Sequence, residues 1–203
     1  KVTFVEELTS GKLSVNSDSL IETLSQNVSS RLDIASGVRL TLGRTFEVPA
    51  ETTMELLGSG SGSLDISETL TLSGEIKFNA PGYSLDNGTL ALNGGTLTSV
   101  ENSSVLSDIT HLKNSTLDVA ADKVLSYTGS DLEIGAFTLT MSGEGTFNNS
   151  AEISLNNASS VLKLDGIAKV EHVSVTENLS DGFIDVDKNA TIKILILPIF
   201  YPK

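Results

Sequence analysis

The 203-residue sequence predicts an all-β fold, a right-handed parallel β-helix (β-solenoid) of about seven or eight irregular coils. First, a short apolar-x-apolar unit returns along most of the chain, with the period of two that is typical of half-buried strands. Second, clusters of Gly, Asn, Asp and Ser separate these units, as expected of tight turns. Third, helical spacing of apolar residues occurs only near residues 20–28 and 104–112, which we interpret as caps or loops.

In chain order, residues 1–30 form an expected N-terminal cap, and residues 31–203 form the solenoid, in a single domain overall. The unit occurs at residues 13–15, 32–34, 64–66, 90–92, 117–119, 132–134, 153–155 and 184–186. The steps between successive units are uneven, and we interpret one step as one coil. Further units follow at residues 40–42, 46–48, 70–72, 76–78 and 137–139, so each coil is expected to hold two or three strands.

A sandwich or barrel of hairpins is the alternative all-β architecture, but it needs longer strands and tight hairpin turns. The solenoid is favoured because Leu or Ile usually comes first in the unit and Ile, Leu or Val comes third, which allows an aliphatic ladder along the axis. The glycine-rich residues 58–62 are expected to bulge as a loop. The apolar residues 192–201 are either a last strand that caps the core or the start of another coil.

Composition excludes several classes of function. Thirteen basic and 26 acidic residues give a net charge of −13, so a nucleic-acid partner would be repelled. The chain has no cysteine, which excludes disulfides, thiolate metal sites and cysteine nucleophiles, and no cofactor is expected. The longest apolar run, residues 192–200, is interrupted and too short to cross a bilayer, so membrane insertion is not expected.

The segment LEIGAFTLTMSGEGTFNN, residues 132–149, resembles a coil of filamentous-haemagglutinin-like or autotransporter-passenger adhesins. Residues 64–79 show the same alternation of strands and turns, and the resemblance covers residues 32–196. It implies a right-handed β-helix outside a bacterial cell, usually non-enzymatic, that serves as a stalk or an adhesive face. It therefore implies an extracellular or cell-surface location, a surface glycan or protein receptor as partner, and further coils or domains in a longer parent chain.

The three arginines of the chain, Arg31, Arg39 and Arg44, fall close together in the sequence. A guanidinium group binds a carboxylate through two parallel hydrogen bonds, so these residues are candidates for recognising a carboxylated glycan. Tyr83 and Tyr127 are candidate stacking surfaces for a sugar ring.

Acidic residues suggest two further candidates, each with a simpler structural explanation. The middle position of the recurring unit is acidic at Asp33, Asp65, Asp118, Glu133 and Asp185. These carboxylates are expected to point outward, either in a staggered stripe or simply as solvated positions.

The second acidic candidate lies near the C-terminus. Asp185, Asp187 and Asn189 follow the first half of a calcium loop, but Ala190 replaces the required glycine. A β-turn explains the same residues. His111 and His172 have no zinc-like spacing and are expected at the surface.

We therefore expect a non-enzymatic extracellular module that attaches to a glycan or to a host or solid surface through a rigid solenoid face. One alternative is a polysaccharide-binding module for an insoluble glycan, with Tyr83, Tyr127 and Phe147 on one face. Another is a β-helix polysaccharide lyase or hydrolase, which needs a cleft of clustered acids, with or without a basic residue. The third is a passive fibre or stalk segment.

Overall fold

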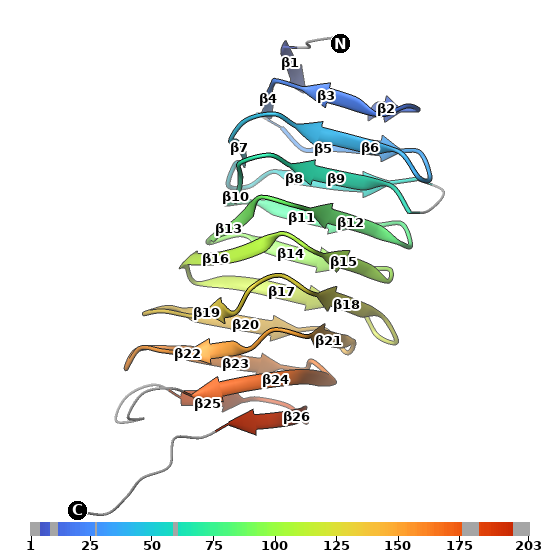
Figure 1. Cartoon of the computed structure of the whole chain (residues 1–203). Coiled ribbons are helices and arrows are strands. Elements are labelled where there is room, and N and C mark those ends of the chain that lie inside the picture. Colours follow the sequence, from blue (N-terminus) through green and yellow to red (C-terminus); the bar gives the residue numbers. More distant parts are fainter. Residues whose placement is uncertain (1–4, 9–11, 27, 59–60, 176–182, 197–203) are drawn as a thin grey trace, which may run out of the picture.

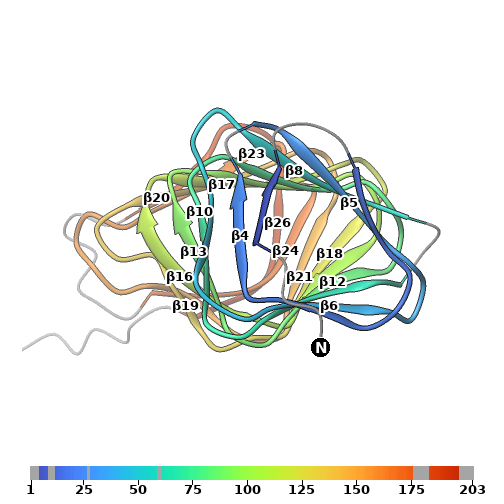
Figure 2. The same ribbon diagram turned by 90° about the horizontal axis from the view of Figure 1, so that it is seen from above.

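The computed structural model of the chain describes residues 5–8, 12–26, 28–58, 61–175 and 183–196. Every regular element in this part of the chain is a β-strand, and the strands pair in parallel and wind into a solenoid of about eight turns (Figure 1). Seen from the N-terminal end, the chain runs clockwise as it recedes, so the solenoid is right-handed (Figure 2). The predicted fold class is confirmed.

Three sides enclose the core. Side A is a nine-stranded parallel sheet. Its strands are β2 (Lys12–Val15), β5 (Ser30–Ile34), β8 (Thr53–Leu57), β11 (Glu75–Phe78), β14 (Thr96–Ser99), β17 (Ser115–Val119), β20 (Thr138–Ser142), β23 (Val161–Asp165) and β25 (Phe183–Val186). Ladder partners on this side, such as Leu13 with Leu32 and Leu97 with Leu117, are separated in sequence by one coil.

Side B carries the first strands of an eleven-stranded sheet. They are β3 (Ser19–Ile21), β6 (Arg39–Leu42), β9 (Ser63–Ile66), β12 (Tyr83–Asp86), β15 (Ser103–Val105), β18 (Val124–Tyr127) and β21 (Thr146–Asn149). Side C carries β7 (Phe46–Val48), β10 (Thr69–Leu72), β13 (Thr89–Asn93), β16 (Asp108–Lys113), β19 (Leu132–Glu133) and β22 (Ile153–Leu155).

The remaining strands close the two ends. At the N-terminal end β1 (Val5–Leu8) pairs with β4 (Thr23–Gln26), which lies next to β7. At the other end β24 (Lys169–Val175) pairs with β21 through its first residues and with β22 through its last, so it joins sides B and C. The last strand, β26 (Thr191–Ile196), pairs with β24. No helix long and apolar enough to span a membrane occurs in the described segments.

The core consists of inward-facing columns, in which similar apolar residues of successive coils stack on one another. On side C, Leu70 lies between Phe46 and Leu90 in the ladder, and all three are buried. On side A, Ile76 lies between Met54 and Leu97, each with none of its surface exposed. Burying one such side chain stabilises the fold by about 1.5–3 kcal/mol, so the columns are its main stabilising element.

The recurring units do not form a single stripe. Residues 13–15, 32–34, 117–119 and 184–186 lie on side A, 64–66 on side B, and 90–92, 132–134 and 153–155 on side C. The number of residues between successive units varies because some units are separated by one side of the solenoid and others by several sides. The number of residues in one coil is nearly constant. The acidic middle positions are therefore distributed over all three sides, which corrects the expectation of one acidic stripe.

In their described part, the two places with helical spacing, residues 20–28 and 104–112, contribute strands β3, β4, β15 and β16. Parallel pairing to a neighbouring coil overrides local helical periodicity because the ladder pairs the backbone donors and acceptors of each strand. Within residues 1–30, β2 and β3 pair in register with β5 and β6, so the stacking of coils extends into this segment.

Candidate functional site

A groove on side B brings together small hydroxyl side chains and one of the predicted arginines. Ser63, Ser84 and Ser104 are successive ladder partners, and Arg39 precedes them in the same outward column. We call this depression of about 530 Å³ the serine groove; its lining is Asp18, Gly37, Val38, Arg39, Ser61, Ser63, Gly82, Ser84, Asp86, Ser104 and Leu106. It runs along the solenoid axis across neighbouring coils.

The groove follows from strand alternation. In β9, β12 and β15 a serine stands beside an inward residue, and these inward residues, Leu64, Leu85 and Val105, stack in one buried column. The serines therefore face outward at one hydroxyl per coil, about 4.8 Å apart. The column continues to Ser126 and Asn148 beyond the groove.

Carboxylates flank the hydroxyl row. Asp86 is the ladder partner of Asp65, and its Oδ1 is buried without a hydrogen-bond partner among the described residues. Asp65 accepts hydrogen bonds from Thr41 Oγ1 at 3.2 Å and from Asn87 Nδ2 at 2.6 Å. A serine hydroxyl both donates and accepts and a carboxylate accepts, so the groove presents donors and acceptors side by side.

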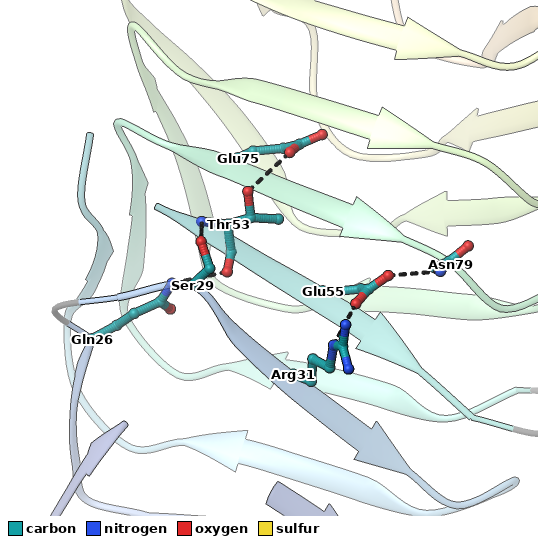
Figure 3. Close-up of polar contacts among 7 residues, drawn as sticks. All are labelled: Gln26, Ser29, Arg31, Thr53, Glu55, Glu75 and Asn79. Atoms are coloured by element: carbon teal, nitrogen blue, oxygen red, sulfur yellow. Dashed lines mark hydrogen bonds and ion pairs between the residues drawn. The ribbon is translucent and has the colours of Figure 1, made fainter. Parts of the chain in front are cut away.

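A second depression lies on side A, near its N-terminal end. We call it the Arg31 cleft; its volume is about 500 Å³, and it is lined by Lys12, Ser29, Ser30, Arg31, Thr53 and Glu55. Figure 3 shows its polar contacts. Ser29 Oγ accepts a hydrogen bond from the Thr53 backbone N–H at 3.0 Å, and Thr53 Oγ1 donates to Glu75 Oε2 at 3.0 Å.

The two cations of the Arg31 cleft are each held by one carboxylate. Arg31 Nε donates to Glu55 Oε2 at 3.0 Å, and Glu55 Oε1 accepts from Asn79 Nδ2 at 2.7 Å (Figure 3). Lys12 Nζ donates to Asp33 Oδ2 at 2.7 Å. The Arg31 side chain is nevertheless 64% exposed, and its ion pair uses Nε, so the outer edge of the guanidinium faces solvent.

The third depression is acidic and contains a buried histidine that sequence reasoning placed at the surface. It lies on side C, where β16 and β19 are neighbours but do not pair in a ladder. Its volume is about 370 Å³, and its lining includes Asp108, His111, Asp131 and Glu133. His111 continues the inward column of Leu72 and Leu92, which explains why it is only 6% exposed.

Contacts of His111 bridge the break in the ladder. Its Nδ1 lies 3.0 Å from the carbonyl oxygen of Ile134, and its ring meets Phe137 edge-on at 5.7 Å between centroids. Desolvation lowers the pKa of His111 below 6.5, although the carbonyl groups of Ile134 and Lys113 act in the opposite direction. A neutral imidazole whose Nδ1 carries the proton fits this arrangement, because a carbonyl oxygen only accepts.

The three predicted arginines are not brought together. Arg31 lies on side A, Arg39 begins β6 on side B, and Arg44 is exposed in the turn that follows β6. The backbone N–H of Arg39 donates to Asp18 Oδ1 at 2.9 Å, which fixes the start of its strand. The arginines therefore contribute to two separate depressions rather than to one site.

The predicted aromatic surface is inside the solenoid, which corrects the interpretation of Tyr83 and Tyr127 as ligand-stacking residues. Both have none of their surface exposed, and Phe147 is 1% exposed. All three rings do share side B, but they point inward, and Tyr127 stacks on Phe147 at 6.1 Å. Burial raises the pKa of both tyrosine hydroxyls above 10.0.

The calcium-like segment follows β25 on side A. Asp187 pairs with Lys163 Nζ at 2.8 Å, and Asp185 is the ladder partner of Lys163. The Asp187 carboxylate raises the pKa of Lys163, so an ammonium group already balances the charge of this segment. Asn189 is exposed. Among the described residues, no three His, Asp or Glu side chains lie together in a way that could hold a metal ion.

The serine groove and the depression around His111 were not predicted from the sequence. The signal for the groove is one serine per coil, at positions 63, 84 and 104, and it can be recognised only when the register between coils is known.

In comparisons with known proteins, no family model, no curated protein and no solved structure matches the chain.

Proposed function

We propose that the chain is a non-enzymatic adhesive module that acts outside the cell or at its surface and attaches to a glycan through the serine groove of side B. The observation that carries the proposal is the row of Ser63, Ser84 and Ser104 in direct ladder register within a groove of about 530 Å³. A rigid row of hydroxyls with a fixed spacing suits a ligand that is itself a regular polymer.

Recognition in this groove relies on hydrogen bonds rather than ring stacking, because the tyrosines of side B are buried. The serines donate to and accept from sugar hydroxyls, the Asp86 carboxylate accepts, and the Arg39 guanidinium donates at one end of the row. The strand spacing of about 4.8 Å is comparable with the advance of one hexose in an extended β-linked glycan, so successive sugars meet successive coils.

Affinity for one sugar is expected to be modest, since exposed hydrogen bonds contribute about 0.5–1.5 kcal/mol each. Strength then comes from many equivalent contacts along the rod, in the manner of multivalent attachment. This mode needs no reactive residue, which is why the proposal is a binding module and not a polysaccharide-cleaving enzyme.

The test is to incubate the purified chain with an array of glycans and extracellular-matrix proteins, and then to measure the affinity for the best glycan by calorimetry. The double variant Ser84→Ala and Ser104→Ala is expected to lower the affinity on the order of tenfold, through loss of two hydrogen bonds. The matched control is the double variant Thr96→Ala and Thr116→Ala, which removes two outward hydroxyls from side A.

Three results would overturn the proposal. The first is the absence of glycan binding, and the second is equal affinities of the two double variants. The third is the appearance of new reducing ends when the bound glycan is incubated with the chain, which would show that the module cleaves its ligand.

A further inference from the structure

The Arg31 cleft on side A has features that the glycan proposal for side B does not use. We infer that this cleft binds an anionic substituent of a polysaccharide, a carboxylate or a sulfate group, between Arg31 and Lys12. The inference rests on the proposed function for the class of polymer, but it concerns a different side of the solenoid and a different chemistry.

Two cationic side chains lie next to each other in the cleft. Lys12 and Arg31 are direct ladder partners on β2 and β5, so their outward side chains start about 4.8 Å apart. Like charges that face each other across neighbouring strands destabilise a sheet. Asp33, which pairs with Lys12, and Glu55, which pairs with Arg31, offset this repulsion, and an oxyanion held between the two cations adds to that compensation.

The ion pair of Arg31 leaves the terminal nitrogens of its guanidinium accessible. Glu55 accepts a hydrogen bond from Nε, at 3.0 Å, and is itself held by Asn79 (Figure 3). The Arg31 side chain is 64% exposed and lines the cleft. A guanidinium group binds a carboxylate or sulfate through two parallel N–H hydrogen bonds.

The experiment compares polymers that differ only in charge. Polygalacturonate is measured against its fully methyl-esterified form, and dextran sulfate against dextran, by calorimetry with the whole chain at low ionic strength. The first pair reports on carboxylate and the second on sulfate. We expect a tighter complex for the charged member of at least one pair, and a loss of that difference when salt is raised.

Variants then assign the effect to the cleft. Arg31→Gln is expected to weaken binding of the charged polymer on the order of tenfold, and to leave the uncharged polymer unaffected. Arg44→Gln, which removes the same charge from an exposed turn outside the cleft, is expected to change little. Thermal melting of each variant checks that the fold is intact.

Glu55→Gln separates the inference from a purely structural ion pair. Replacing this carboxylate releases the guanidinium, so the affinity for the charged polymer is expected to rise severalfold, whereas a structural role predicts no gain in affinity. The control is Glu47→Gln, which removes one negative charge from side C.

Equal binding of charged and uncharged polymers, or equal effects of Arg31→Gln and Arg44→Gln, would overturn the inference. Failure of the side B proposal looks different: the double serine variant then has no effect, while the dependence on Arg31 remains.

Discussion

Removal of the Tyr83 hydroxyl tests whether this ring is a structural core residue or a ligand contact. Tyr83 Oη accepts a hydrogen bond from the Ile34 backbone N–H at 2.7 Å, and its single proton is within reach of the carbonyl oxygens of Ile34 and Leu57. These partners belong to β5 and β8, so one side chain connects three successive coils through the interior. Tyr83→Phe keeps the ring, which means that the variant removes the hydrogen bonds without creating a cavity.

The expected loss follows from these contacts. One net hydrogen bond contributes about 1 kcal/mol, and the buried N–H of Ile34 left without a partner adds about 1–2 kcal/mol, so Tyr83→Phe is expected to lower the free energy of unfolding by about 2–3 kcal/mol. With a urea m-value of about 2–3 kcal/mol/M, the unfolding midpoint falls by about 1 M.

The assay is urea unfolding followed by far-ultraviolet circular dichroism, with glycan binding measured on the same samples. Tyr127→Phe is the matched control, because its hydroxyl donates within its own turn, to Ser130 O, and meets Ile109 N–H at a longer 3.3 Å; it should lose less stability. An unchanged midpoint for Tyr83→Phe together with weaker glycan binding would refute the interior assignment.

Three other predictions address the core, a corner and a titrating group. Leu70→Asp should lower the unfolding free energy by several kcal/mol in urea titrations and Thr71→Asp by little, because Leu70 is fully buried and Thr71 is an outward neighbour; equal losses would contradict the inward column. Gly143→Ala should lower the melting temperature, since φ is +81° and a Cβ would lie 2.0 Å from Val119 O; an unchanged value would mean that the corner relaxes freely. The pKa of His111 is lowered from 6.5 in the fold, so the unfolded chain takes up its proton first and stability should fall as the pH drops below 6.5; urea titrations of wild type and His111→Asn across this range should show that the variant loses this dependence.

The strands and their inward-facing residues could be predicted from the sequence, because both depend on the local alternation of apolar and polar residues. Residues 32–34, 64–66 and 117–119 each form part of a strand with two buried residues around an outward one, as predicted. The direction of Leu32 or Leu117 follows from the period of two, which needs no knowledge of the neighbouring coil. The parallel solenoid itself was predicted from this pattern.

The register between coils decides which residues share a surface, and this register depends on how the coils stack on one another. Arg31 and Arg39 are close in the sequence and lie on different sides, whereas Ser63 and Ser84 are a full coil apart in the sequence and adjacent in space. Tyr83 was misplaced although the period of two already pointed to the interior, because it alternates with Ser84 and shares its face of the strand with the buried Leu85.

The sequence alone therefore determined the architecture, because hydrophobic alternation and turn residues act over a few neighbouring positions. The tertiary structure decided the contents of each outward column and the two separate depressions that hold Arg31 and Arg39. The physical reason is that backbone pairing between coils depends on the number of residues in each turn, and a shift of one residue moves a side chain from solvent to core.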